Sequence, residues 1–121
     1  MIANAKLRVA VVGLGFGAEF VPIYKDHPDV ASVAICDKDE KRLKVVGERF
    51  NIQQRFGDIR DVISSTQIDA VHLVSGIPDH APQAVAVLES GKHCACTVPM
   101  ATSLSDIRAI MRAQKRSGKN Y

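Results

Sequence analysis

Short apolar runs alternate along this chain with longer segments in which apolar residues recur every three or four positions. Such runs are typical of strands buried in a parallel sheet, and such segments are typical of the helices that cover it. Four runs predict strands, at Leu7–Val12, Val30–Cys36, Ala70–Val74 and His93–Cys96. A fifth run, Gln53–Phe56, is too polar for the centre of a sheet and is the least strand-like. The alternation predicts a doubly wound α/β fold with a mostly parallel sheet.

The helical segments between these runs have recognisable starts and ends. Pro82 suits the first turn of a helix that Gly91 ends, and Ser103 with Asp106 forms a capping-box start for the last helix. Pro22 falls inside the first helix and predicts a kink there, because an interior proline costs about 3 kcal/mol. Helical spacing predicts the buried sides of three helices: Leu43, Val46, Gly47 and Phe50; Ala84, Val85 and Leu88; and Leu104, Ile107, Ile110 and Met111.

Composition narrows the class of protein. At 121 residues, 46% of them hydrophobic and 24% charged, the chain has room for one core, and we expect residues 1–121 to form a single domain. The net charge is +3, only 5% of residues are aromatic, and the one basic group is Lys115, Arg116 and Lys119. We interpret that group as a solvated helix end and expect no nucleic-acid partner.

The sequence also lacks the marks of two other classes. Residues 1–6 contain no apolar core of a signal peptide, and no run approaches the roughly 18 apolar residues of a membrane span. We therefore expect a soluble, cytoplasmic protein without a membrane partner. Cys36, Cys94 and Cys96 form no CxxC pair, so we interpret all three as buried or half-buried thiols and expect no metal site.

A glycine-rich turn directly follows the first predicted strand. Gly13-Leu14-Gly15-Phe16-Gly17-Ala18 matches the pattern that binds the pyrophosphate of a dinucleotide when a strand precedes it and a helix follows. Gly13 would permit the tight turn, Gly15 would let the pyrophosphate approach, and Ala18 would let helix and strand pack closely. The N–H groups of residues 15–18 would hold the phosphates. The pattern predicts a Rossmann fold, and the alternative is a glycine turn in another α/β fold.

An acidic residue at the end of the second predicted strand completes this pattern. Asp37 follows Gly15 by 22 positions, close to the expected 20 or so. Its carboxylate would accept hydrogen bonds from the adenosine ribose and repel a 2′-phosphate, which favours NAD over NADP. Lys38 and Arg42 keep NADP possible, because either could neutralise that phosphate. The alternative is that Asp37 only caps the next helix.

Together these features resemble the N-terminal NAD(P)-binding domain of the Gfo/Idh/MocA oxidoreductases, the family of glucose–fructose oxidoreductase and inositol dehydrogenase. The resemblance covers nearly the whole chain. It implies an oxidoreductase that acts on a sugar or polyol-like substrate, with a dinucleotide cofactor as its partner. We also expect a homo-oligomer, because the sheet edge and helix faces that the family's second domain would cover are left partly bare. Beyond the glycine turn and Asp37, the resemblance rests on Asp69-Ala70-Val71, Ile77-Pro78-Asp79-His80-Ala81-Pro82, Glu89-Ser90-Gly91-Lys92-His93 and Val98-Pro99-Met100-Ala101.

The resemblance also places two loops beside the cofactor. The loop after the fourth strand contributes Ser75, Gly76, Ile77, Pro78 and His80. The family often has Thr-Pro-Asn-x-x-His there, so this chain departs from the pattern, and His80 either approaches the cofactor from a neighbouring position or lies exposed. The second loop contributes Thr97 and Val98. Family members commonly have Glu-Lys-Pro there, and the valine that replaces the lysine has no proton to give.

Three functions remain open. The resemblance implies a substrate-binding domain that would begin past Tyr121, so this chain alone is expected to carry no catalytic residue and to be inactive. The first interpretation is the cofactor-binding domain of a sugar or polyol oxidoreductase. The alternative is a non-catalytic nucleotide-binding or assembly module, which the missing lysine favours. A third is an NAD-using lyase or glycosidase of the same superfamily.

Overall fold

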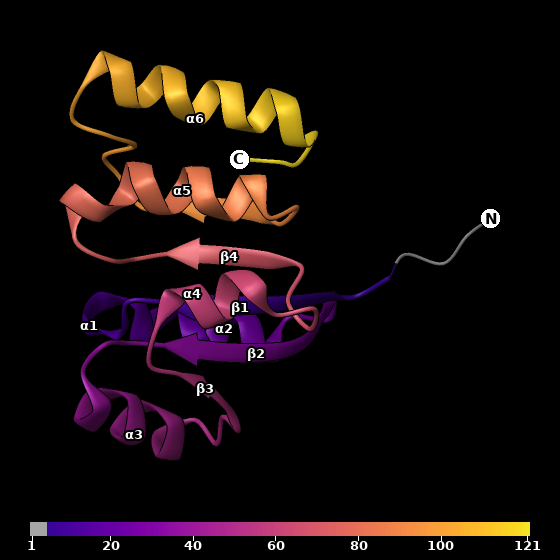
Figure 1. Ribbon diagram of the computed structural model, residues 1–121. Coiled ribbons are helices and arrows are strands. Elements are labelled where there is room, and N and C mark those ends of the chain that lie inside the picture. Colours follow the sequence, from indigo (N-terminus) through magenta and orange to yellow (C-terminus); the bar gives the residue numbers. More distant parts are fainter. Residues whose placement is uncertain (1–4) are drawn as a thin grey trace.

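The computed structural model describes residues 5–121 and shows one parallel sheet with helices on both faces (Figure 1). Five strands lie in the order β3-β2-β1-β4-β5, and every neighbouring pair is parallel. The strands are β1 Leu7–Val12, β2 Val30–Cys36, β3 Gln54–Phe56, β4 Ala70–Leu73 and β5 His93–Cys96. This arrangement confirms the predicted doubly wound α/β Rossmann fold. The polar strand β3 lies at an edge of the sheet, where its polarity is tolerated.

Within residues 5–121, six α-helices join and cover the strands. They are α1 Leu14–Gly17, α2 Val21–Asp26, α3 Glu40–Arg49, α4 Ile59–Ser64, α5 His80–Glu89 and α6 Leu104–Ser117. The helix after β1 is interrupted as predicted: a 3₁₀ turn at Ala18–Phe20 separates α1 from α2, and Pro22 lies in the first turn of α2. A proline there lacks only an N–H that has no helical partner. The sequence did not predict α4, whose start is set by the Asp58 carboxylate accepting from the Arg60 N–H.

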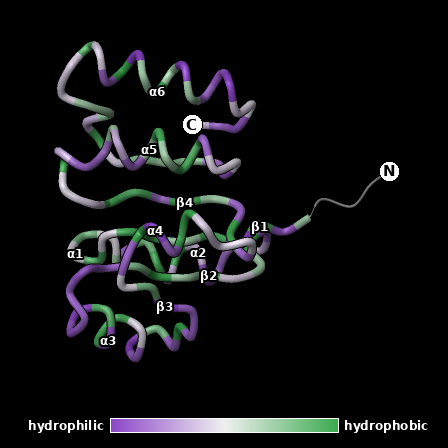
Figure 2. The backbone as a smooth tube through the Cα atoms, in the orientation of Figure 1, coloured by the Kyte–Doolittle hydropathy of each residue, from purple (hydrophilic) through white to green (hydrophobic). Residues whose placement is uncertain are grey.

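Two apolar clusters lie on opposite faces of the sheet. One packs α4, α5 and α6 against the sheet, and Val71, Leu88 and Ile110 are among its fully buried members. The other packs α1, α2 and α3 against β1 and β2, around Val11 and Ile35. Cys36 and Cys94 are buried and Cys96 is half-buried, as predicted. Hydrophobic positions run along the central strands, and hydrophilic positions alternate with them in α3 and α6 (Figure 2).

The predicted buried sides of α5 and α6 need correction. Leu104 and Met111 are 69% and 60% exposed, whereas Ile110 is buried as predicted and Ala113 is buried beside it. The reason is that α6 packs against α5 and so presents only a narrow contact. In α5, Val87 is fully buried and Val85 only partly, because this helix lies between β5 and α6 and is covered on two sides.

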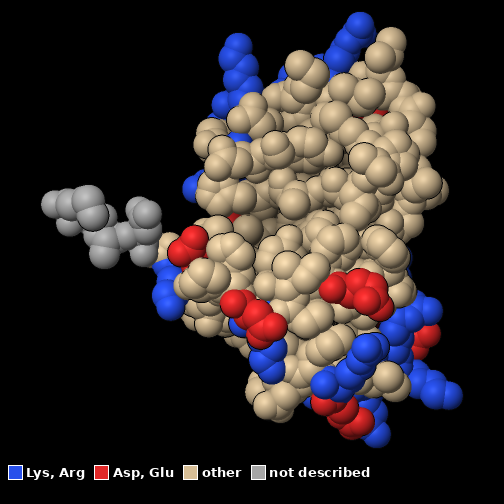
Figure 3. Space-filling model, turned by 180° about the vertical axis from the view of Figure 1, so that it is seen from behind, with Lys and Arg blue, Asp and Glu red and all other residues tan. Residues whose placement is uncertain are grey.

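On the face that carries α1 and α2, Tyr24 of α2 and Phe20 of the preceding turn reach β4, whereas Ala95 of β5 is exposed. Charged side chains lie at the margins and in the lower half of this face, and the area between is uncharged (Figure 3). His72 of β4 lies here, its Nδ1 2.9 Å from the Tyr24 hydroxyl and its ring against Phe20, and burial lowers its pKa. No helix among the described residues is both long and apolar enough to cross a membrane.

Asp69 joins three strands at the amino edge of the sheet. Its carboxylate accepts from the Arg8 backbone N–H and from two guanidinium nitrogens of Arg8, at 2.8–2.9 Å. Its own N–H donates to the Arg8 carbonyl, and its carbonyl accepts from the His93 N–H. The bonds from Arg8 hold the pKa of Asp69 at about 2. Asp69 therefore fixes the register of β1, β4 and β5 where they begin.

This arrangement predicts that Asp69→Asn lowers the stability of the fold by an amount that depends on pH. Because the folded-state pKa lies below the unfolded value of about 4, the carboxylate stabilises the fold above that pH and ceases to do so as the pH falls through about 2. We expect the variant to be less stable by about 1 kcal/mol at pH 7, since the pair is partly open to water. Urea unfolding at pH 7 and pH 2 measures it, with exposed Asp26→Asn as control. An equal loss at both pH values would contradict the account.

Candidate functional site

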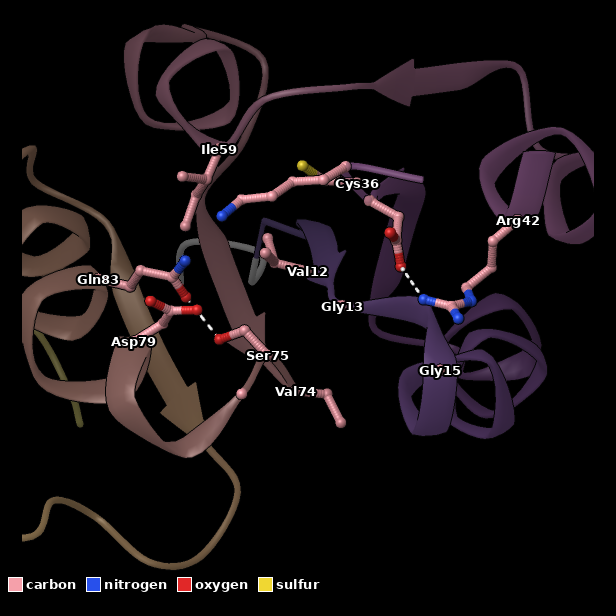
Figure 4. A pocket seen from close by; sticks show the side chains of 13 residues that line it. Val12, Gly13, Gly15, Cys36, Arg42, Ile59, Val74, Ser75, Asp79 and Gln83 are labelled. Carbon is pink, nitrogen blue, oxygen red and sulfur yellow. Dashed lines mark hydrogen bonds and ion pairs between the residues drawn. The ribbon is translucent and has the colours of Figure 1, made fainter. Parts of the chain in front are cut away.

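A pocket of about 300 Å³ lies where the carboxyl ends of β1, β2 and β4 meet (Figure 4). In open α/β sheets ligands bind at this edge, beside the point where the strand order reverses. Here the reversal falls between β1 and β4, because the chain leaves β3 at one edge and re-enters beside β1. The pocket is lined by Val12, Gly13, Gly15, Cys36, Asp37, Lys38, Arg42, Ile59, Val74, Ser75, Gly76, Asp79 and Gln83.

Gly13 forms the tight turn that the sequence predicts. Its φ is +90°, and its N–H donates to the Cys36 carbonyl at 2.9 Å. A Cβ at this position would lie 2.7 Å from backbone atoms of Val74 and Ser75. Only glycine fits, both for its backbone angle and for the space between two chain segments.

The other glycines of the turn have different surroundings. Gly15 has no heavy atom within 4 Å of where a Cβ would stand, so its backbone is open toward the pocket. Gly17 lies against the sheet, where a Cβ would come 3.1 Å from Val11 and 3.2 Å from Val74. Ala18 is buried in the cluster beneath. The close packing of helix on strand, predicted for Ala18, therefore depends on Gly17 as well.

Asp37 connects the glycine turn to the end of β2. Its Oδ2 accepts from the Leu14 N–H and its Oδ1 from the Asp39 N–H, both at 2.8 Å. The helix-cap alternative is wrong, because the N-cap of α3 is Asp39, whose carboxylate accepts from the Arg42 N–H. A carboxylate offers about four lone-pair sites, so Asp37 can still accept from a ligand in the pocket.

Two cations line the pocket together with this carboxylate. Arg42 reaches from α3 and places Nη1 3.5 Å from Oδ2 of Asp37 (Figure 4). Lys38 is exposed and also lines the pocket. The pocket thus presents one buried carboxylate with an arginine beside it, and a second, exposed cation among its lining residues.

The loop after β4 forms the opposite wall only in part. Ser75 and Gly76 line the pocket, and the Ser75 hydroxyl donates to Oε1 of Gln83 on α5 at 2.5 Å (Figure 4). Ile77 and Pro78 lie in an exposed 3₁₀ turn, Ile77–Asp79, and neither lines the pocket. Of this turn, only Asp79 does.

His80 is neither exposed nor in the pocket, and the expectation of an exposed loop histidine is wrong. The side chain is 1% exposed, with Nε2 2.9 Å from the Ser75 carbonyl and Nδ1 2.7 Å from the Pro99 carbonyl. Both ring nitrogens are therefore engaged by backbone oxygens. His80 ties the loop after β4 to the loop after β5.

Three further predicted residues also lie outside the pocket lining. Val98 is 90% exposed, in a cis peptide bond with Pro99. The Thr97 hydroxyl donates to the Leu73 carbonyl at 3.3 Å and so joins β5 to β4. Phe16 is exposed, with its ring 5.7 Å from that of Phe20. Among the described residues, Val98 and Phe16 are therefore left exposed, and Thr97 is half-buried between two strands.

The sequence reasoning missed several wall residues. Val12 and Cys36 end β1 and β2, Val74 follows β4, and Ile59 and Gln83 come from α4 and α5. The ends of predicted strands were a usable signal for the first three, whereas α4 and the inward side of α5 depend on tertiary packing. Burial, and then the nearby Asp37 charge, raises the pKa of Cys36 to about 12, so its thiol serves as a neutral wall.

Comparisons with known proteins agree with this geometry. A family model described as the GFO_IDH_MocA oxidoreductase family, NAD-binding Rossmann fold, matches residues 7–121. The chain is 33% identical over 108 residues to a D-apiose dehydrogenase of Rhizobium rhizogenes, covering 88% of this chain and 31% of that protein. A D-apiose dehydrogenase of Paraburkholderia graminis is 29% identical over 114 residues, with 93% and 30% covered.

Solved structures show the same likeness. An oxidoreductase from Agrobacterium radiobacter, in complex with NAD⁺, L-tartaric acid and magnesium, superposes with a TM-score of 0.87 at 30% identity, covering 95% of this chain and 34% of that one. The WlbA dehydrogenase from Bordetella pertussis, in complex with NADH and UDP-GlcNAcA, gives 0.86 at 26%, with 98% and 36% covered. The chain spans about a third of the length of these relatives.

The two glycines make a matched pair of variants. Gly13→Ala should destabilise the fold by about 2–4 kcal/mol, because its Cβ meets backbone on both sides and its φ is strained. Gly15→Ala should leave stability unchanged or raise it by up to about 1 kcal/mol, since alanine is the better helix former and meets nothing. Urea unfolding of both variants is the test. Equal losses would show that the turn is not shaped as described.

Proposed function

Because this chain belongs to the Gfo/Idh/MocA oxidoreductase family, we propose that its pocket binds NAD, with NADP as the second possibility. On this proposal, the chain is the cofactor-binding domain of an oxidoreductase that acts on a sugar or polyol-like substrate. The observation that carries the proposal is the meeting of the Gly13–Ala18 turn with Asp37 in one pocket at the carboxyl edge of the sheet. A bound nicotinamide would supply the hydride acceptor or donor.

The residues present fit a dinucleotide. The backbone at Gly15 is open, so a pyrophosphate can approach where any other residue would place a Cβ. Ser75 and Gly76 face this turn across the pocket, and Val12, Ile59 and Val74 give it apolar walls. Polar groups at the turn with apolar sides are what an adenine nucleotide requires.

Asp37 supports NAD as the preferred form. Its oxygens already accept from the Leu14 and Asp39 N–H groups and keep lone pairs for ribose hydroxyls. A 2′-phosphate carries about −1.5 to −2 charge and would meet this buried carboxylate. For NADP to bind, Arg42 would have to leave Asp37 for the phosphate, which its 3.5 Å contact and half-exposed side chain permit.

The substrate class rests on the relatives. Among the similar proteins are D-apiose dehydrogenases and a myo-inositol 2-dehydrogenase of Thermotoga maritima, which is 27% identical over 112 residues. These names describe a sugar and a cyclic polyol. Because the chain spans about a third of such relatives, we place substrate selection in a further domain and assign no catalytic residue to residues 1–121.

A second candidate is a non-catalytic nucleotide-binding or assembly module. The observation that favours it is Val98, which stands where the family commonly has its lysine and is 90% exposed. We also propose that the chain self-associates, because Leu104, Met111 and Phe16 are exposed apolar side chains and β5 is an edge strand. Light scattering that finds a monomer at high concentration would contradict self-association.

We expect weak binding of NADH and a shift of cofactor choice in Asp37→Ser. The change removes a ribose acceptor and a repulsive charge beside Lys38 and Arg42, so the ratio of NADH to NADPH affinity should fall by about tenfold. Calorimetric titration measures both affinities. Asp39→Ser removes a neighbouring carboxylate outside the pocket and should leave the ratio unchanged. A folded protein that binds neither cofactor at millimolar concentration would defeat the proposal.

We expect no dehydrogenase turnover by this chain, and none by Val98→Lys. Removing a general acid–base group typically costs about 10²- to 10⁴-fold in rate, and losing substrate positioning costs several kcal/mol more. A lysine at position 98, which is exposed and outside the pocket, would at most restore the acid–base group and would leave substrate positioning lost. Absorbance of the reduced nicotinamide with sugars, inositols and polyols is the assay, and a full-length family member is the positive control. Turnover by the unmodified chain would refute this expectation.

A further inference from the structure

A buried lysine lies at the amino edge of the sheet, opposite the cofactor pocket. At the end of α5, the Gly91 N–H donates to the Leu88 carbonyl at 3.0 Å and the Lys92 N–H to the Val87 carbonyl at 3.3 Å, with Gly91 at φ +86°. This is the Schellman ending of a helix, and the position of Lys92 in it usually holds an apolar residue that packs back on the helix. Lys92 is accordingly only 7% exposed.

The ammonium group of Lys92 has no partner among the described residues. It makes no hydrogen bond or ion pair with any of them and is open to solvent, since none of their buried side-chain nitrogens or oxygens lacks a partner. Asp69, the acid whose charge acts on Lys92, has both carboxylate oxygens bound by Arg8. Burial, and repulsion from Arg8, lower the pKa of Lys92 against the opposing effect of Asp69. A lysine that served only the negative end of α5 would donate to one of its carbonyls, and Lys92 donates to none.

Lys92 lines an open pocket of about 530 Å³ whose charge is strongly positive. Lys6, Arg8 and Lys119 stand around it with Lys92, against the single carboxylate of Asp69. Ser65 and Thr66 add hydroxyls that accept from Gln67, at 3.1 and 3.5 Å, which leaves their O–H groups available to donate. Unpaired ammonium groups beside free hydroxyl donors suit an anion with several acceptor oxygens.

We propose that this pocket binds a phosphate group, either the free ion or the phosphate of a small metabolite, with Lys92 as its central contact. The dianion would pair with the Lys92 ammonium, which reaches the pocket from a largely buried side chain, and it would receive hydrogen bonds from Ser65 and Thr66. The site lies at the other edge of the sheet from the Gly13–Ala18 turn and is independent of the proposed cofactor function.

The test follows the thermal midpoint of the chain as inorganic phosphate or glycerol 3-phosphate is added, with sodium chloride at equal ionic strength as reference. A ligand that binds only the folded state raises the midpoint with concentration. We expect such a rise, and we expect Lys92→Met to weaken phosphate binding by about tenfold or more, as for a lost charge-assisted bond. In phosphate-free buffer the variant should be at least as stable as the parent, because an apolar side chain suits this position.

Two control variants distinguish binding at this pocket from phosphate binding elsewhere on the chain. Lys44→Met removes an exposed lysine outside the pocket and should retain the phosphate response. Gly15→Ala alters the turn at the other edge and should retain it too, while Lys92→Met should bind NADH as the parent does. A rise no larger than that in chloride, or an undiminished rise in Lys92→Met, would overturn the proposal. A response to inorganic phosphate alone would assign the free ion, and a stronger response to glycerol 3-phosphate would assign a metabolite.

Discussion

Gly13 lies so close to the backbone of Val74 and Ser75 that no Cβ fits between them, and this contact sets where the site forms. The turn that begins there is held from the other side by Asp37, which accepts from the Leu14 N–H. The carboxyl ends of β1, β2 and β4 are thus brought within hydrogen-bonding distance, β1 contacting each of the other two. The open backbone at Gly15 and the acceptor oxygens of Asp37 follow from that convergence, and they suit a dinucleotide.

The sequence predicted much of this because the information is local. Apolar runs located β1, β2, β4 and β5 to within a residue, and Gly13-Leu14-Gly15 located the turn. Ser103 was correctly assigned as a helix cap, since its hydroxyl accepts from the Asp106 N–H three residues on. Contacts between residues three or four positions apart can be predicted from the spacing of residue types.

What the sequence did not predict depends on partners far along the chain. His80 was expected to lie exposed or near the cofactor, and its ring instead bonds to carbonyls of Ser75 and Pro99. Leu104 and Met111 fit a helical stripe, yet α6 packs mainly against α5, so they remain exposed. Nothing in the sequence marks Lys92 as buried, and it is the ending of α5 that places most of its side chain inside. Periodicity gives the side of a helix and leaves open how much of that side a neighbour covers.

The central claim is that a dinucleotide binds across the glycine turn at the carboxyl edge of the sheet. Amide chemical shifts followed by NMR during an NADH titration test it residue by residue. We predict the largest changes at Gly15, Asp37, Ser75 and Gly76, with the amides near His72 and Lys92 unaffected. Changes centred on His72 or Lys92, or none at saturating NADH in a folded protein, would contradict the account.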